Sequence, residues 1–219
     1  MPRALLFLML RVGQAFLFVL FVGPLSAQQV VDRIVARVED DIILLSEVRE
    51  LGRYQQLVEG QAASDTRLLD RLIDQWIVAS EAAAAHYPRP SEAKVDRALE
   101  RLEKQLGGAD AYRGRLRELG LSAAAVRRLV ERQMYLARYL AYKFRPAVQV
   151  DAAAIEKYYR EELAPPLAAK GQAAPPLETV QDQIRELLTE RGINEHAARW
   201  LEETRSRLKV EGEAPGQQP

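Results

Sequence analysis

An alternation of apolar and polar residues marks the first regular segment of the chain, residues 30–48. Within it, Ile34, Ala36 and Val38 alternate with residues that are mostly polar, which predicts a strand with one buried face. The acidic run Glu39-Asp40-Asp41 then favours a turn, because short acidic side chains can bond to nearby backbone groups. Apolar residues resume directly afterwards. The pattern therefore predicts a β-hairpin followed by a helix.

Further along, apolar residues recur at intervals of three and four, which is the spacing of an amphipathic helix. Serine, aspartate and glycine residues stand where these stretches begin and end. The pattern predicts helices over residues 46–59, 65–85, 92–106, 109–119, 123–144, 151–163 and 177–208. Gly192 predicts a weak point or kink in the last of them, since glycine costs about 1 kcal/mol relative to alanine. The predicted fold class is mainly α, a multi-helix core with a small N-terminal β-hairpin.

A hairpin of two strands is marginal by itself, so another segment must extend or cover it. The best candidate is Leu208-Lys209-Val210, which follows the last helix and is compatible with a strand. We therefore expect the last helix to pack back on the others and its exit to add a third strand. This arrangement predicts a single domain over residues 28–210. A proline- and alanine-rich loop or linker is expected at 164–176, and a disordered tail at 211–219.

The segment from Met1 to Ala27 predicts a secretion signal. Arg3 supplies positive charge, residues 15–22 form an unbroken apolar run, and Pro24 precedes a short sequence suited to cleavage. The alternative is an uncleaved membrane anchor, since residues 4–22 are almost long enough to span a bilayer. Polar residues interrupt that stretch, so cleavage is favoured. After cleavage the protein is expected in the periplasm, without a membrane span.

Composition excludes several classes of function. The chain has 31 basic and 31 acidic residues, so it lacks the basic surplus typical of proteins that bind nucleic acid. It has no cysteine, so an exported form must fold without disulfides. His86 and His196 have no nearby histidine or cysteine partner in the sequence, and the acidic run at 39–41 lacks the spacing of a calcium loop. We expect no metal, no cofactor and no catalytic residues.

Several segments together resemble a known family. These are VDRIVARVEDDIILLSEV at 31–48, RLLDRLIDQWIVASEAA at 67–83, GADAYRGRLRELGLS at 108–122 and LETVQDQIRELLTERGINEHAARWLEETRSRLKV at 177–210. In their content and order they are similar to the N-terminal module of the SurA-type periplasmic chaperones, which are related to the PrsA and PpiD foldases. The resemblance covers most of the chain after the signal. It implies a helical chaperone domain that a C-terminal helix and strand complete.

The chain departs from that family at one place. In the family, a parvulin-type prolyl isomerase module commonly lies between the segments that correspond here to 151–163 and 177–208. Only residues 164–176 occupy that position in this chain. The resemblance therefore implies the chaperone core without isomerase activity, and no enzymatic function is expected.

The fifth predicted helix carries a stripe of tyrosines that is a candidate binding surface. Tyrosine suits contact with many partners, because its rigid ring buries a large area at little entropic cost. The same stripe can instead pack against other helices, and the sequence leaves both readings open. The short helix at 109–119, bounded by glycines, offers further apolar candidates. The candidate client-binding residues are Tyr135, Tyr139, Tyr142, Tyr112, Leu116, Leu119 and Leu121.

Two functions fit these observations. The first is a holdase-type chaperone that binds unfolded or extended polypeptides of the envelope or outer membrane through an apolar cleft. The second is an adaptor or structural subunit that uses the same module to bind one specific partner. Either could act as a monomer or as a dimer that exchanges its last helix.

Overall fold

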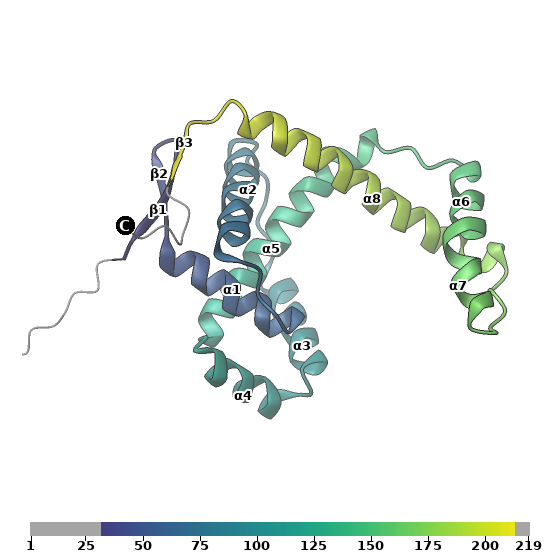
Figure 1. The fold of residues 1–219 in the computed structure, drawn as a ribbon, viewed down its shortest axis with the longest axis horizontal. Helices are drawn as coiled ribbons and strands as arrows, with labels where there is room; N and C mark the ends of the chain where they lie inside the picture. Colours follow the sequence, from purple (N-terminus) through teal and green to yellow (C-terminus); the bar gives the residue numbers. More distant parts are fainter. Residues whose placement is uncertain (1–31, 213–219) are drawn as a thin grey trace, which may run out of the picture. The chain divides into compact units, whose positions relative to one another are not determined.

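The computed structural model describes residues 32–212. The predicted secretion signal and residues 213–219 of the predicted tail lie outside this range. The elements are β1 (Ile34–Val38), β2 (Asp41–Leu44), α1 (Leu45–Glu59), α2 (Asp65–Ala84), α3 (Glu92–Gln105), α4 (Ala109–Leu119), α5 (Ala123–Phe144), the 3-10 turn η1 (Arg145–Ala147), α6 (Ala152–Tyr158), the π-helical turn η2 (Tyr159–Leu163), α7 (Ala164–Ala169), α8 (Leu177–Arg205) and β3 (Val210–Gly212). The predicted fold class is confirmed: the chain is mainly helical, with a small antiparallel sheet that a C-terminal strand completes (Figure 1).

The hairpin forms where the alternation predicts it, but its buried face differs from the prediction. β1 and β2 pair antiparallel, with an irregularity in register between Ile34 and Ala36. This bulge turns Val35 toward the core together with Ala36 and Val38, and it leaves Ile34 43% exposed. The prediction that Ile34 shares the buried face is therefore wrong. Simple alternation cannot reveal an extra residue in a strand. Beyond such a bulge, the side chains that pointed to one face of the sheet point to the other.

The predicted C-terminal strand is present as β3, two residues further along than expected. It pairs antiparallel with β1, so the sheet order is β2-β1-β3. Gly212 is required by this pairing, since a Cβ there would lie 2.8 Å from the Val35 carbonyl oxygen. Glu211 and Gly212 thus belong to the sheet, and the prediction that the disordered tail begins at residue 211 is wrong for these two residues.

Glu39, in the hairpin turn, also holds the chain that leads into β3. Its backbone N–H donates to the Lys209 carbonyl oxygen at 3.0 Å, and its Oε1 accepts the Lys209 backbone N–H at 2.9 Å. Asp41, at the start of β2, accepts a bond from Trp76 Nε1 on α2 at 2.7 Å. Two acids of the run at 39–41 therefore fasten the hairpin to distant parts of the chain.

The helix boundaries follow the local signals closely. Ser64, Ser122 and Asp151 precede α2, α5 and α6, and the side chain of each accepts a backbone N–H from the first turn of its helix. α4 ends at Gly120 in the left-handed conformation (φ 61°), which glycine adopts without strain. These short-range interactions explain why the sequence locates most helices within a few residues.

The loop or linker predicted at 164–176 is shorter than expected. Residues 164–169 form α7, which continues from α6 through η2, so only residues 170–176 lack helical structure before α8. Pro165 and Pro166 lie in the first turn of α7, directly after the π-helical turn η2. The helical path therefore continues through the two prolines. Tyr159 Oη donates to the Pro175 carbonyl oxygen at 2.7 Å and ties the remaining loop to η2.

Gly192 lies within α8, which runs unbroken from Leu177 to Arg205. The side chain of Val148 packs against this glycine, and a Cβ at residue 192 would lie 2.6 Å from Val148 Cγ1. The glycine therefore provides space for a neighbouring segment within a continuous helix.

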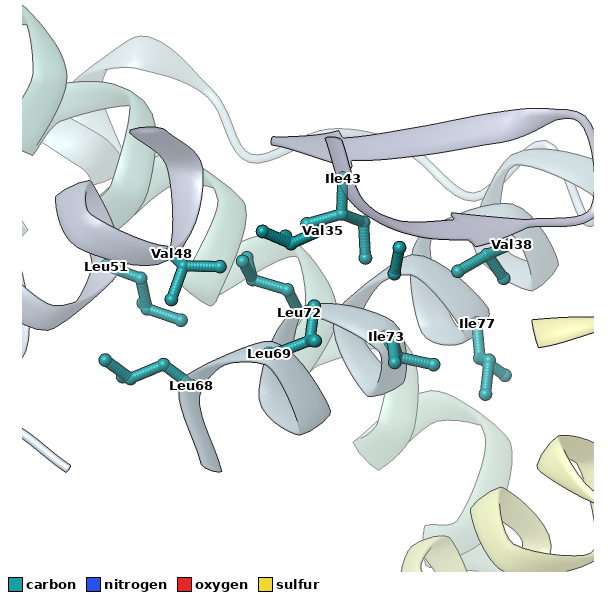
Figure 2. Close-up of a cluster of buried hydrophobic side chains, with 11 residues drawn as sticks. Val35, Val38, Ile43, Val48, Leu51, Leu68, Leu69, Leu72, Ile73 and Ile77 are labelled. Carbon is teal, nitrogen blue, oxygen red and sulfur yellow. The ribbon is translucent and has the colours of Figure 1, made fainter. Parts of the chain in front are cut away.

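The buried apolar residues form three clusters. The sheet cluster joins the hairpin to α1 and α2, and Figure 2 shows Val35, Val38 and Ile43 facing side chains of α2. The helical cluster joins α1, α3, α4 and α5 around Leu57 and Val126. The third cluster joins α2 to α5 around Ala82 and Tyr139. Trp200 and Leu201 of α8 pack against both the sheet cluster and the third cluster.

Candidate functional site

The structure distributes the seven candidate client-binding residues between the interior and the surface. Tyr135, Tyr139, Leu116 and Leu121 are buried, at 7%, 4%, 6% and 7% exposure. Tyr112 and Leu119 are half-buried and pack against the helical cluster. Tyr142 is 65% exposed. The seven residues do not form one surface: the leucines and Tyr112 belong to the helical cluster, and two of the three stripe tyrosines lie in the third cluster.

The tyrosine stripe is organised by a residue that the sequence did not single out. Tyr87 follows α2, and its ring centroid lies 6.1, 5.5 and 5.2 Å from those of Tyr135, Tyr139 and Tyr142. Tyr87 Oη donates to the Arg138 carbonyl oxygen, and Tyr135 Oη donates to the Tyr87 carbonyl oxygen. Two of these hydroxyls are thus used in joining the end of α2 to α5. Sequence spacing within one helix could not show that the fourth ring comes from a neighbouring turn.

A cleft of about 720 Å³ lies between α1, α2 and α5. These three helices lie close together in Figure 1, and α2 contacts both α1 and α5. Small or apolar residues contribute part of the cleft wall: Ala79 and Ala83 from α2, and Leu129 and Tyr135 from α5. Ala79 and Ala83 are four residues apart and so share a face of α2. Their small side chains leave space that larger residues would fill.

Ser46 and seven charged residues form the rest of the cleft wall. The basic ones are Arg53, Arg89, Arg128 and Arg132, and the acidic ones are Glu47, Glu50 and Glu131. Arg128 Nη2 lies 3.2 Å from Glu50 Oε1 and joins α5 to α1. The Arg89 guanidinium lies 5.3 Å from the centre of the Tyr135 ring, a cation–π distance, and 3.8 Å from Glu131. The cleft thus combines an aromatic and aliphatic surface with guanidinium groups.

The sequence carried only a partial signal of this cleft. Helical spacing places Arg128 and Arg132 on one face of α5, and that could have been noticed. No local pattern could bring Arg53 of α1 and Arg89 of the loop after α2 to the same place. The cleft is a product of how α1, α2 and α5 pack, and the periodicity of a single helix does not specify that packing.

The remaining titratable groups show local effects of burial. Burial raises the pKa of the Tyr54 hydroxyl, which lies 3.1 Å from Gln133 Oε1 between α1 and α5. Burial, assisted by the charge of Glu103, raises the pKa of the Tyr112 hydroxyl. His196 stacks on Phe144 at 6.3 Å, and its Nδ1 lies 3.2 Å from Arg199 Nη2. Within residues 32–212, no group of three or more His, Asp or Glu residues has the arrangement of a metal site.

Comparison with known proteins gives no match: neither a family model nor a curated protein is similar to this chain. None of the helices among the described residues combines the length and apolar character needed to cross a membrane.

Proposed function

We propose that the chain is a holdase-type chaperone, which binds unfolded envelope or outer-membrane polypeptides in the cleft between α1, α2 and α5. The observation that carries this proposal is the cleft itself. It is open, it has a volume of about 720 Å³, and it offers aliphatic groups beside guanidinium groups. Such a surface can hold extended polypeptide of varied sequence, because apolar contact is non-directional and arginine side chains adapt to different partners.

The order of the elements also supports this proposal. A hairpin, five helices, a segment that leads away and a long helix that returns to close the sheet are the arrangement that the resemblance to the SurA-type N-terminal module implies. Only residues 170–176 separate α7 from α8. We therefore propose a chaperone without prolyl isomerase activity, exported to the periplasm by the segment 1–27.

The experiment fills the cleft without changing its charge. Ala83→Trp places a large ring on the cleft face of α2, and Ala84→Trp places the same ring on the neighbouring exposed position outside the cleft. We expect Ala83→Trp to weaken suppression of aggregation of a urea-denatured outer-membrane β-barrel protein by about tenfold, or 1.4 kcal/mol in binding. Ala84→Trp should retain the activity of the wild type.

Light scattering after dilution of the denatured protein measures the effect, and thermal melting verifies that both variants fold. Equal activity of the two variants would remove the cleft from the proposal, and an inactive wild type would remove the holdase function. A photo-crosslinking residue at position 83 in living cells then separates a chaperone from an adaptor. Many captured polypeptides support the chaperone, and a single stoichiometric partner supports the adaptor.

A further inference from the structure

The charges in the cleft between α1, α2 and α5 are unequally satisfied. Each of its three carboxylates has a partner: Glu50 binds Arg128, Glu131 lies beside Arg89, and Glu47 accepts the Leu44 backbone N–H at 2.8 Å. Among residues 32–212, Arg53 and Arg132 form no ion pair and donate no side-chain hydrogen bond, although both line the cleft. The charged groups of the cleft that have no partner within residues 32–212 are therefore two guanidiniums.

Helix stability does not explain this arrangement. Arg128 and Arg132 are four residues apart on α5, and like charges at that spacing destabilise a helix. Nor does the whole chain carry a positive surplus that would place arginines everywhere, since its formal net charge is zero. What distinguishes Arg53 and Arg132 is their position, because guanidiniums from two different helices line a common space.

From these charges we propose that the cleft selects extended polypeptide segments that carry aspartate or glutamate side chains close to apolar residues. This inference rests on the proposed function and specifies its client class. A guanidinium can bind a carboxylate through two parallel hydrogen bonds, so Arg53 and Arg132 supply the complementary groups. Leu129 and the methyl groups of Ala79 and Ala83 line the same cleft and contact the apolar neighbours of the acid. The four arginines against three glutamates also disfavour basic segments.

The test compares peptides that differ only in charge. One is a short fluorescein-labelled peptide with several aspartates between tyrosine and serine residues, blocked at both ends; its counterpart has asparagine in place of aspartate. A third peptide keeps the asparagines but has a free C-terminal carboxylate. It tests whether the cleft binds the end of a chain rather than acidic side chains. We expect the wild type to bind the aspartate peptide roughly fivefold more tightly than the other two, on the scale of one or two exposed ion pairs.

The double variant Arg53→Gln/Arg132→Gln should lose this preference. Its affinity for the aspartate peptide should fall to its affinity for the asparagine peptide, and the wild-type preference should also shrink in high salt. The matched control is Arg71→Gln/Arg117→Gln, which removes two exposed arginines of α2 and α4 that lie outside the cleft and form no ion pair within residues 32–212. This control should keep the full preference.

Each result has a distinct meaning. Equal wild-type affinity for the aspartate and asparagine peptides overturns the selectivity for acidic segments, even if the protein suppresses aggregation. A preference for the free C-terminal carboxylate alone, or a preference that survives Arg53→Gln/Arg132→Gln, overturns it as well. If the wild type neither binds any of the peptides nor suppresses aggregation, the proposed holdase function fails together with the inference.

Discussion

The sheet cluster and the helical cluster are built from different parts of the chain. The helical cluster takes its buried residues and their packed neighbours from Tyr54 to Met134, a continuous stretch. The sheet cluster begins with Val35 and is completed by Trp200, Leu201 and Leu208, which lie far along the chain. Both clusters meet on α1, where Val48 and Leu51 belong to the sheet cluster, and Tyr54 and Leu57 belong to the helical cluster.

This difference shows which region depends on the C-terminal segment. Contacts between residues that are near in sequence form at a low cost in loop-closure entropy, whereas joining β3 to β1 closes most of the chain into a loop. The sheet cluster is therefore fully covered only when both ends meet, because Trp200, Leu201 and Leu208 pack against it, whereas the helical cluster has no member from the C-terminal segment. α1 carries residues of both clusters, and α1 and α5 also line the cleft. The two clusters are therefore coupled through helices that form the candidate site.

The largest expected effect comes from removing the C-terminal segment. A chain that ends at Pro176 loses α8 and β3, and with them the contacts of Trp200 and Leu201. We expect a loss of several kcal/mol in the free energy of unfolding, since Ile184 and Ile193 of α8 are also buried and such side chains contribute about 1.5–3 kcal/mol each. The measurement is a denaturant melt of residues 28–176 beside residues 28–219, with hydrogen exchange to locate the loss.

Amides of β1 and α2 should lose more protection than amides of α3 and α4, because only the former pack against the missing segment. An unchanged midpoint and slope would mean that α8 is an independent appendage. Uniform loss of protection would mean that the two clusters unfold together and that their different origins have no energetic consequence.

Two helical glycines, Gly192 in α8 and Gly114 in α4, give medium effects of opposite sign. Gly192→Ala in α8 places a Cβ 2.6 Å from Val148 Cγ1, and we expect the overpacking, typically about 1–3 kcal/mol, to outweigh the gain in helix propensity. Gly114→Ala in α4 meets no heavy atom within 4 Å, so it should gain roughly 1 kcal/mol from helix propensity. Denaturant melts of both variants measure the difference.

The control for the first glycine is the double variant Gly192→Ala/Val148→Ala, which removes the methyl groups that the new Cβ would meet. In the Val148→Ala background, Gly192→Ala should therefore lower the free energy of unfolding by much less than it does in the wild type. Stabilisation by Gly192→Ala itself would show that Val148 moves aside freely and that the glycine serves another purpose.

The smallest expected effect concerns a carboxyl group where α8 meets α2. Burial raises the pKa of Asp74 above its usual value, the opposing charge of Arg205 lowers it, and the charge of Asp70 raises it further. An acid with a raised pKa binds more protons in the folded state, so its contribution to stability falls as pH rises from its ordinary value, about 4, through the folded pKa. Its ionised form is therefore slightly destabilising at neutral pH.

Asp74→Asn should thus flatten the fall in stability over that acidic range and give a small gain at neutral pH. The gain is limited because Asp74 is partly exposed and because asparagine loses the attraction to Arg205, which lies 3.7 Å from the carboxylate. Urea melts at a series of pH values measure the slope, and Asp182→Asn on the exposed side of α8 is the comparison. An identical pH dependence in wild type and Asp74→Asn would contradict the prediction.

The sequence by itself determined the elements whose causes are local. Ser122 and Asp151 cap their helices through bonds to residues three positions away, and Gly120 ends α4 because it adopts a left-handed conformation. The position of β3 was also predictable, because a two-stranded hairpin needed a third strand and the segment after α8 could supply it. The helix ends depend on interactions within one turn of the chain. The third strand depends on the general requirement that the open edge of a sheet be paired or covered.

Only the tertiary structure decided the features that depend on neighbours distant in sequence. The bulge that turned Val35 inward, the packing of Val148 on Gly192 and the ring of Tyr87 among the α5 tyrosines all follow from contacts between separate segments. The cleft is the clearest case, because Arg53, Ala83 and Arg132 come from three helices. A periodic pattern defines which face of a helix is apolar, but the packing of the helices determines which faces meet and what space remains between them.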